Sequence, residues 1–106
     1  MLYRSQAMNE ITKALSSQRR QQVLKWLLDP VTNFPAQHTG DLEKDGVCVG
    51  FIADKLGIAQ PSATSHMKIL QEAGLVMPTR IAQWTFYRRD EVGIEHARSV
   101  LGSILS

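Results

Sequence analysis

Two helical patterns separated by a very short connection are the feature that most constrains the fold of this chain. In the first pattern, apolar residues recur on one helical face, at Val49, Ile52, Ala53 and Leu56. Gly57 then suits the left-handed conformation in which many helices end. After residues 58–60, Pro61 fits the first turn of a second helix, where its missing N–H costs nothing. Two helices joined by so tight a turn predict a helix-turn-helix.

The second helix of this pair is predicted over residues 61–73, and Gly74 followed by Leu75 supplies its stop. Three apolar residues at helical spacing are expected to face inward: Ala63, Met67 and Leu70. The opposite side is polar and contains no acidic residue: Gln60, Thr64, Ser65 and Lys68. Such a face suits insertion into the major groove of DNA, so this segment is the predicted recognition helix.

A change of period after Gly74 predicts a β-hairpin. Residues 76–80 and 84–88 have strand-like patterns on either side of a turn at residues 81–83. Arg80 and Arg88 could extend from this wing towards DNA phosphates. Trp84 and Phe86, like Met67, are expected in the core because aromatic and thioether side chains fill volume more often than they bind ligands.

Helices are also predicted near both ends of the chain. Residues 8–15 form a short amphipathic pattern, and Ser17 can cap the next helix, which should end before Pro30. Residues 90–105 place apolar side chains at helical spacing, at Ile94, Ala97, Leu101 and Ile104. So broad an apolar face on a terminal helix would form an exposed stripe in a monomer, which predicts a dimer.

Residues 30–46 are rich in turn-forming residues and have no sustained period, so they predict a long inserted loop. Loops of this length inside one domain tend to be functional or mobile. Phe34 and Pro35 could cover an apolar pocket beside the helical turn, which makes the loop a candidate switch. His38 and the nearby acids offer metal ligands in principle, but acidic loops are more often simply solvated.

Composition fits a single domain over residues 1–106 that is mainly helical with a small hairpin. The chain has a net charge of +2 and one cysteine, Cys48, which cannot build a thiolate cage or an intrachain disulfide. No signal peptide or apolar run of membrane-spanning length is readable, so the expected compartment is the cytoplasm and no membrane partner is expected. Without a catalytic triad, phosphate loop or ligand-spaced cluster, neither an enzyme nor a metal or other cofactor is predicted.

Arg20, His66 and Cys48 each admit two readings. Arg20 could touch a phosphate or hold its helix in place, and His66 could lie at the DNA surface or hydrogen-bond inside the helix pair. Cys48 could act as a redox group or serve as a small apolar side chain, and the second role is the commoner one.

Five segments in order along the chain resemble the ArsR/SmtB family of repressors. They are Ala14-Leu15-Ser16-Ser17-Gln18-Arg19-Arg20, Ile52-Ala53-Asp54-Lys55-Leu56-Gly57, Gln60-Pro61-Ser62-Ala63-Thr64-Ser65-His66-Met67-Lys68-Ile69-Leu70, Glu72-Ala73-Gly74-Leu75-Val76 and Trp84-Thr85-Phe86-Tyr87-Arg88. The resemblance implies a winged helix-turn-helix that dimerises through its first and last helices. It also implies a two-fold symmetric operator of double-stranded DNA and repression that is relieved by a small-molecule inducer.

The resemblance also implies roles for individual residues. Gln60, Thr64 and Ser65 match base-reading positions, and Lys68 and Arg80 match phosphate contacts. With two flanking residues, the predicted DNA-binding set is Gln60, Ser62, Thr64, Ser65, Lys68, Arg80 and Arg88. The predicted dimer interface is Met8, Ile11, Ile94, Ala97, Leu101 and Ile104.

Two departures from the family pattern bear on the signal. Gly50 stands where metal-sensing members have the second cysteine of a Cys-X-Cys pair, and Asp90 is followed by Glu91 and Val92, so His96 lacks its usual partner. Neither metal site of the family is therefore expected here. The alternative function from another class is a winged-helix protein-interaction module without DNA binding, which would favour an acidic or apolar outer face on the second helix.

Overall fold

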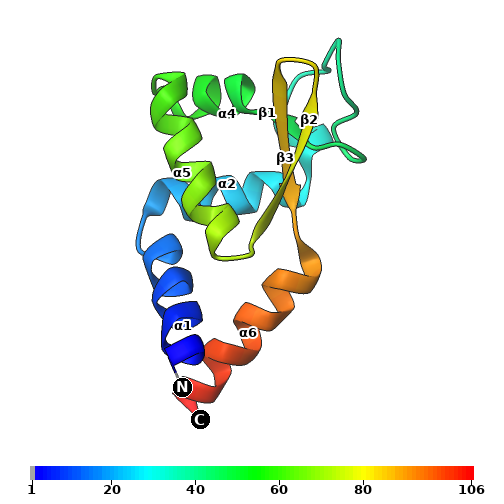
Figure 1. The fold of residues 1–106 in the computed structure, drawn as a ribbon. Helices are drawn as coiled ribbons and strands as arrows, with labels where there is room; N and C mark the ends of the chain where they lie inside the picture. The colour runs from blue at the N-terminus through cyan, green and yellow to red at the C-terminus, as the bar shows by residue number, and fades with distance from the viewer. Residues whose placement is uncertain (1) are drawn as a thin grey trace.

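The computed structural model describes residues 2–106, with side chains from residue 6 onward, as helices and a small antiparallel sheet (Figure 1). The elements in chain order are α1 (Leu2–Leu15), α2 (Gln18–Leu28), α3 (Pro30–Asn33), β1 (Val47–Cys48), α4 (Val49–Leu56), α5 (Gln60–Glu72), β2 (Val76–Ile81), β3 (Trp84–Arg89) and α6 (Glu91–Leu105). The mainly helical fold with a hairpin wing that the sequence predicts is confirmed.

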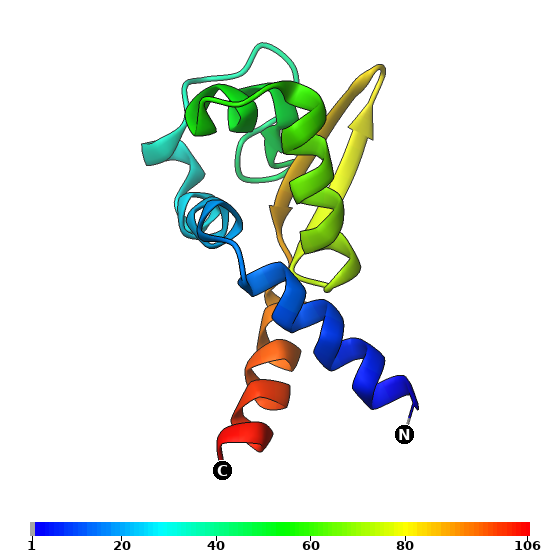
Figure 2. The same cartoon turned by 90° about the vertical axis from the view of Figure 1, so that its left-hand side faces the viewer.

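The molecule is elongated, with principal extents of 44 × 25 × 24 Å. At one end α2, α4 and α5 pack together beside the hairpin, and at the other end α1 and α6 extend in the same direction and carry the two termini (Figures 1 and 2). The hydrophobic core includes side chains from every helix except the short α3, and its fully enclosed members include Ala14, Val23, Ile52, Met67 and Leu70.

The predicted helix boundaries are set by local capping. The Ser17 side chain accepts a hydrogen bond from the Arg20 amide at the start of α2. Gly57 ends α4 with a φ of 69°. Gly74 adopts a φ of 76° after α5, and the Leu75 amide donates to the Leu70 carbonyl, which closes the predicted glycine stop. These local signals explain why the helix-turn-helix could be read from the sequence.

The first helix is longer than predicted, and a short strand was missed. α1 begins at Leu2 instead of residue 8. β1 pairs antiparallel with β3, with Val47 opposite Tyr87 and Cys48 opposite Phe86, and makes the sheet three-stranded in the order β1-β3-β2. Two residues are too few to display a period, so only the tertiary pairing identifies this strand.

The inserted segment is packed onto the domain rather than free of it. It opens with α3, capped by Asp29, and Phe34 is buried. The Gln37 side chain then accepts from the Cys48 amide at 2.7 Å and donates to the Gly46 carbonyl at 3.0 Å, so it completes the open edge of β1. At Gly40, which has a φ of 78°, a Cβ would lie 2.7 Å from Cε1 of Phe86. A side chain at this position would collide with the ring.

The wing turns within two residues, Ala82 and Gln83, because Ile81 pairs with Trp84 as the last step of the β2–β3 ladder. Ala82 has a φ of 53°, in the left-handed region that usually holds glycine. The expectation that Trp84 belongs to the core is wrong, since 44% of its surface is exposed. Phe86 and Met67 are buried as expected.

The start of α6 makes an unusually close backbone contact. Asp90 caps the helix by accepting from the Gly93 amide at 3.0 Å. A Cβ on Gly93 would overlap the carbonyl oxygen of Gly74, in the turn that follows α5. The absence of a side chain at Gly93 therefore lets the first turn of α6 lie directly on the end of the helix-turn-helix.

Candidate nucleic-acid interface

The outer face of α5 carries five of the seven predicted DNA-binding residues. Its inner face is formed by Ala63, Met67 and Leu70, each with 0% exposure. On the outer side Thr64 is half-buried. The other four residues are exposed: Gln60, Ser62, Ser65 and Lys68. The structure therefore brings these side chains together on the side of α5 that does not pack against the core.

The polar groups of this face from Gln60 to Ser65 are short or flexible, and its charged residues are Lys68 and, in the last turn of α5, the exposed Glu72. No acidic residue lies in the first turn of α5, and Lys68 is the cation two turns along from Gln60. The Ser65 hydroxyl donates to the Pro61 carbonyl at 3.2 Å, whereas its oxygen retains acceptor capacity. This arrangement offers hydrogen-bond donors and acceptors for base edges with a cation for the backbone.

The two wing arginines lie at opposite ends of the hairpin. Arg80 is exposed near the tip, and its Nε donates to the Ala82 carbonyl at 3.1 Å, which holds its stem against the turn. Arg88 is half-buried at the wing base, opposite Met77, and its Nε is buried without a hydrogen-bond partner. Arg80 is therefore the better placed of the two for a phosphate contact.

Arg20 has a structural role at this site. Of the two roles that the sequence left open for it, a phosphate contact or holding its helix in place, the structure supports the second. Only 8% of Arg20 is exposed. Its Nε donates to the Ala14 carbonyl at 2.9 Å and its Nη2 to the Lys13 carbonyl at 2.8 Å, so it satisfies the open C-terminal end of α1. Its Nη1 lies 2.9 Å from Nδ1 of His66, on α5. Burial, followed by the charges of Arg20 and Arg19, lowers the pKa of His66.

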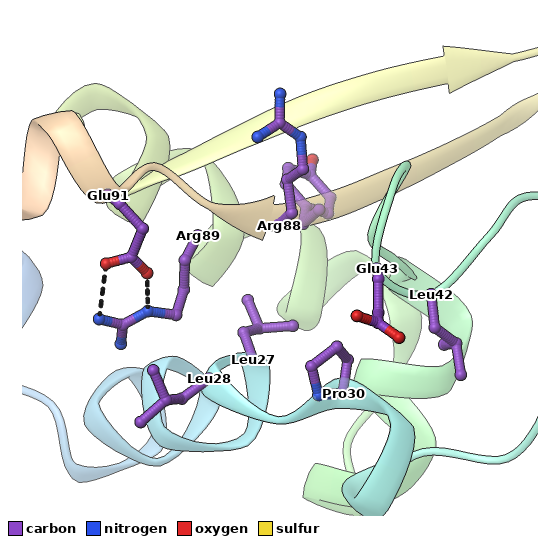
Figure 3. Close-up of a pocket in the computed structure, with 9 residues that line it drawn as sticks. Leu27, Leu28, Pro30, Leu42, Glu43, Arg88, Arg89 and Glu91 are labelled. Carbon is purple, nitrogen blue, oxygen red and sulfur yellow. Dashed lines mark hydrogen bonds and ion pairs between the residues drawn. The ribbon is translucent and has the colours of Figure 1, made fainter.

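Arg89 is a second internal anchor, and the sequence offered no signal for it. Its guanidinium pairs with the Glu91 carboxylate, with Nε 2.6 Å from Oε1, and donates from Nη1 to the Leu24 carbonyl at 3.1 Å. This pairing lowers the pKa of Glu91. Figure 3 shows Arg89 turned towards Glu91 above α2, while Arg88 points away from Leu27 and Pro30.

Two surface hollows border the inserted segment. The hollow in Figure 3, of about 220 Å³, lies between the end of α2 and β3 and includes Leu42 and Glu43 from the segment. The other, of about 300 Å³, lies where Phe34 and Pro35 face Phe51 and Lys55 of α4. The Lys55 ammonium is 5.0 Å from the centre of the Trp26 ring, which meets Phe34 edge to face. Phe34 and Pro35 thus line a hollow as predicted, but it lies against α4, and none of residues 57–60 of the turn lines it.

The predicted dimer-interface residues differ in burial within a single chain. Ile11, Ile94 and Ala97 are 2%, 8% and 4% exposed, so the chain's own packing already covers them. Met8 and Leu101 are half-buried, and Ile104 is 52% exposed. Of this predicted set, the side chains that keep apolar surface are therefore Met8, Leu101 and Ile104, and Leu105 is exposed next to Ile104.

No group of three potential metal ligands lies together within the part of the chain that the structure describes. Cys48 is half-buried at the start of α4, and His38 is exposed in the inserted segment. Asp41 accepts from the amides of Glu43 and Lys44, which lowers its pKa, so it serves as a turn cap. Within residues 2–106, no helix is long and apolar enough to cross a membrane.

Comparison with known proteins gives clear relatives. No family model matches the sequence. It is 45% identical over 86 residues to an HTH-type transcriptional regulator of Bacillus subtilis, YbzH, covering 80% of this chain and 85% of that protein. It is 32% identical over 78 residues to an HTH-type transcriptional regulator of Methanocaldococcus jannaschii, covering 74% and 72% of the two chains.

Solved structures agree in fold. The crystal structure of an ArsR family transcriptional regulator superposes with a TM-score of 0.66 at 19% identity, covering 93% of this chain and 87% of that one. HlyU from Vibrio cholerae superposes with a TM-score of 0.62 at 25% identity, covering 98% and 97%. Both sequence relatives and the first of these structures are described as transcriptional regulators.

Proposed function

This chain belongs to the HTH-type transcriptional regulators, and from that premise we propose that it is an ArsR-type repressor that binds a two-fold symmetric DNA operator as a homodimer. The observation that carries the proposal is the polar outer face of α5, which holds no acid from Gln60 to Lys68, with Arg80 of the wing as a second cation. A helix with such a face reads base edges while the cations hold the phosphate backbone.

The proposal assigns roles by chemistry. Gln60, Thr64 and Ser65 read bases, because amide and hydroxyl groups can both donate and accept hydrogen bonds at base edges. Lys68 and Arg80 bind phosphates, and Ser62, in the first turn of α5, and Arg88 lie at the margins of the contact. The exposed polarity of this face argues against the alternative of a protein-interaction module, since binding a protein partner favours apolar anchors.

The second copy would bind at the end formed by α1 and α6. Met8, Leu101 and Ile104 retain exposed apolar surface there, and a two-fold axis through this region would leave both α5 helices free to face one duplex. A dimer of this kind explains why the operator should consist of two half-sites about one helical turn apart.

Release from DNA requires a signal, and the hollow between Phe34, Pro35 and Phe51 is its proposed receptor. A small molecule seated there would touch both the inserted segment and α4, the first helix of the helix-turn-helix. To release DNA usefully it must favour one geometry of the dimer by on the order of 1–3 kcal/mol.

The direct test is an electrophoretic shift with the DNA upstream of the chain's own gene. We expect a discrete complex with the unmodified protein and a weaker one with Lys68→Ala. Lys25→Ala is the matched control, because Lys25 is exposed on the side of α2 opposite buried Val23 and Leu27. If both variants lost the same DNA affinity, only the net charge of the protein would matter for binding. If the unmodified protein formed no complex with DNA, the protein-interaction alternative would be favoured.

A further inference from the structure

The hollow between the inserted segment and α4 borders two aromatic rings that already hold a cation. Lys55 lines this hollow of about 300 Å³, and its ammonium lies 5.0 Å from the centre of the Trp26 ring and 5.8 Å from the centre of the Phe34 ring. The two rings meet edge to face, with an angle of 89° between their planes. Both distances lie within the range over which the face of an aromatic ring attracts a cation, and quaternary ammonium ligands are bound by groups of such rings. A seat for a cation is therefore formed at the edge of the hollow.

Contacts outside the hollow hold this seat in place. The Asn33 side chain donates to the carbonyls of Asp29 at 2.8 Å and Trp26 at 3.2 Å, which ties the short α3 to the end of α2. Phe34, the residue that follows α3, is 5% exposed and belongs to the hydrophobic core. A ligand would therefore not have to order the two rings, and preorganisation of this kind favours binding.

Lys55 is an occupant that can leave the seat. It is exposed in the last turn of α4, and within residues 6–106 it takes part in no ion pair. Its flexible stem lets the ammonium, which is strongly hydrated, turn into water. Departure of Lys55 would leave the faces of Trp26 and Phe34 open to another cation.

Asp54 decides which sign of charge the hollow favours. It also lines the hollow and is exposed, and among residues 6–106 its carboxylate has no ion-pair partner. A cation that entered the hollow would gain this carboxylate together with the two rings. An anion would be repelled by Asp54, and it would have to draw Lys55 away from the rings in order to pair with it. Charge complementarity therefore favours a cationic ligand.

We propose that the hollow binds an organic cation with a quaternary ammonium group, which takes the place of the Lys55 ammonium between Trp26 and Phe34. The methyl groups of such a ligand match a hollow whose other walls include the apolar side chains of Pro35 and Phe51. The inference rests on the proposed function, because it gives a chemical class to the signal received at this hollow. Displacement of Lys55 would break a contact of α4 with α2 and the inserted segment, and α4 leads through the turn into α5.

Three small molecules of closely similar shape test the charge preference. Choline is cationic, 3,3-dimethylbutan-1-ol is neutral and 3,3-dimethylbutanoate is anionic. Trp84→Phe leaves Trp26 as the only tryptophan of the chain, so its emission reports a ligand at the seat. Choline should change this emission saturably and bind at least about tenfold more tightly than the alcohol, and the anion should bind no more tightly than the alcohol. Equal binding of choline and the alcohol, tightest binding of the anion, or no binding of choline would each overturn the proposal.

Substitutions at the rim of the hollow should act in opposite directions on choline. Lys55→Met removes the internal competitor and keeps an unbranched stem, so choline should bind at least about threefold more tightly. Asp54→Asn keeps the shape of the side chain and should weaken choline binding about threefold. Lys13→Met is the matched control, because Lys13 is exposed at the end of α1 and does not line the hollow, and its loss should leave the affinity unchanged. Weaker binding of choline by Lys55→Met would show that the lysine attracts the ligand, and the proposal would then be wrong.

Binding at the hollow and release from DNA can fail separately. With a fluorescently labelled duplex carrying the chain's own upstream DNA, saturating choline should weaken DNA binding by about 5- to 150-fold. If choline bound as expected without changing the DNA affinity, the cation site would stand and the receptor role of the hollow would fall. If the unmodified protein bound no duplex, the repressor proposal would fall, whereas the titration of Trp26 emission would still decide whether the hollow binds cations.

Discussion

Nη1 of Arg20 lies 2.9 Å from Nδ1 of His66, so one buried guanidinium joins the C-terminal end of α1 to α5, the proposed recognition helix. Because the guanidinium can only donate, Nδ1 must accept, and the ring proton sits on Nε2 when His66 is neutral. The same guanidinium satisfies two carbonyls of α1. The orientation of α5 thus depends on a polar network as well as on the core.

Arg20→Ala should destabilise the fold by about 3 kcal/mol, since it leaves buried carbonyl acceptors without donors and removes a packed aliphatic stem. Arg20→Lys should recover only part of the loss, because an ammonium cannot reproduce the planar fork. Urea denaturation followed by circular dichroism measures both, with exposed Arg19→Ala as the control. A loss equal to that of Arg19→Ala would contradict the structural role.

Acidification should weaken the fold through His66. Its pKa is lowered in the folded chain from an ordinary value of 6.5, so the unfolded chain takes up the proton first. The stability that depends on neutral His66 is complete above pH 6.5 and is lost as the pH falls through 6.5 towards the folded pKa. In His66→Gln, whose amide oxygen can still accept from Arg20, denaturation midpoints should vary less over this window. Identical pH profiles for the two proteins would refute the assignment.

The DNA-binding residues should divide into two groups. Lys68→Ala and Arg80→Ala should each weaken binding to all duplexes alike and flatten the salt slope by about one, because phosphate contacts do not read sequence. Gln60→Ala and Thr64→Ala should instead narrow the difference between operator and unrelated DNA. Competition binding at several salt concentrations distinguishes the groups. Altered specificity with unchanged nonspecific affinity in the charge variants would show that the groove assignment is wrong.

Dimerisation should be sensitive to one side of α6. Leu101→Glu should convert a dimer at micromolar concentration into a monomer, since it introduces a charge into the proposed apolar contact. Val92→Glu is the control, because Val92 is 83% exposed and lies half a turn away around the helix axis from Leu101. Light scattering gives the mass directly. A monomeric mass for the unmodified chain would rule out the dimer.

Cadmium and arsenite should not act as dedicated signals. A soft-metal site needs two or three converging thiolates, and each chain supplies only Cys48. A gel shift with added metal should show the complex retained, and Cys48→Ser should behave like the unmodified protein. Release at stoichiometric metal that is lost in Cys48→Ser would overturn this expectation.

The parts of the fold that could be predicted from the sequence are those governed by local signals. Gly57, Gly74 and Ser17 define helix ends through their own backbone or side-chain bonds, and the inward face of α5 follows from residue spacing alone. The outer face of α5 was identified in the same way, as the polar complement of a buried stripe.

The parts that could not be predicted depend on partners distant in sequence. Arg89 donates a hydrogen bond to the Leu24 carbonyl, and Gln37 accepts one from the Cys48 amide at the edge of β1. Neither contact can be predicted from the type of the residue. The prediction that Trp84 is buried was wrong. The strand period indicates on which face of the hairpin a side chain lies, but whether that face is covered depends on where the inserted segment ends. Side-chain type is a weak guide to burial at the end of a hairpin.

The contact between Gly93 and Gly74 has a consequence for how information could pass through this molecule. With no side chain between them, the first turn of α6 lies directly against the turn after α5, so we expect a displacement of one to be passed to the other. The proposed dimer helix, α6, and the proposed DNA-reading helix, α5, are therefore joined at these glycines, so a tilt of one would be passed to the other. A small tilt at the dimer end would alter the separation of the two DNA-reading helices, which is the quantity that an operator with fixed half-site spacing measures.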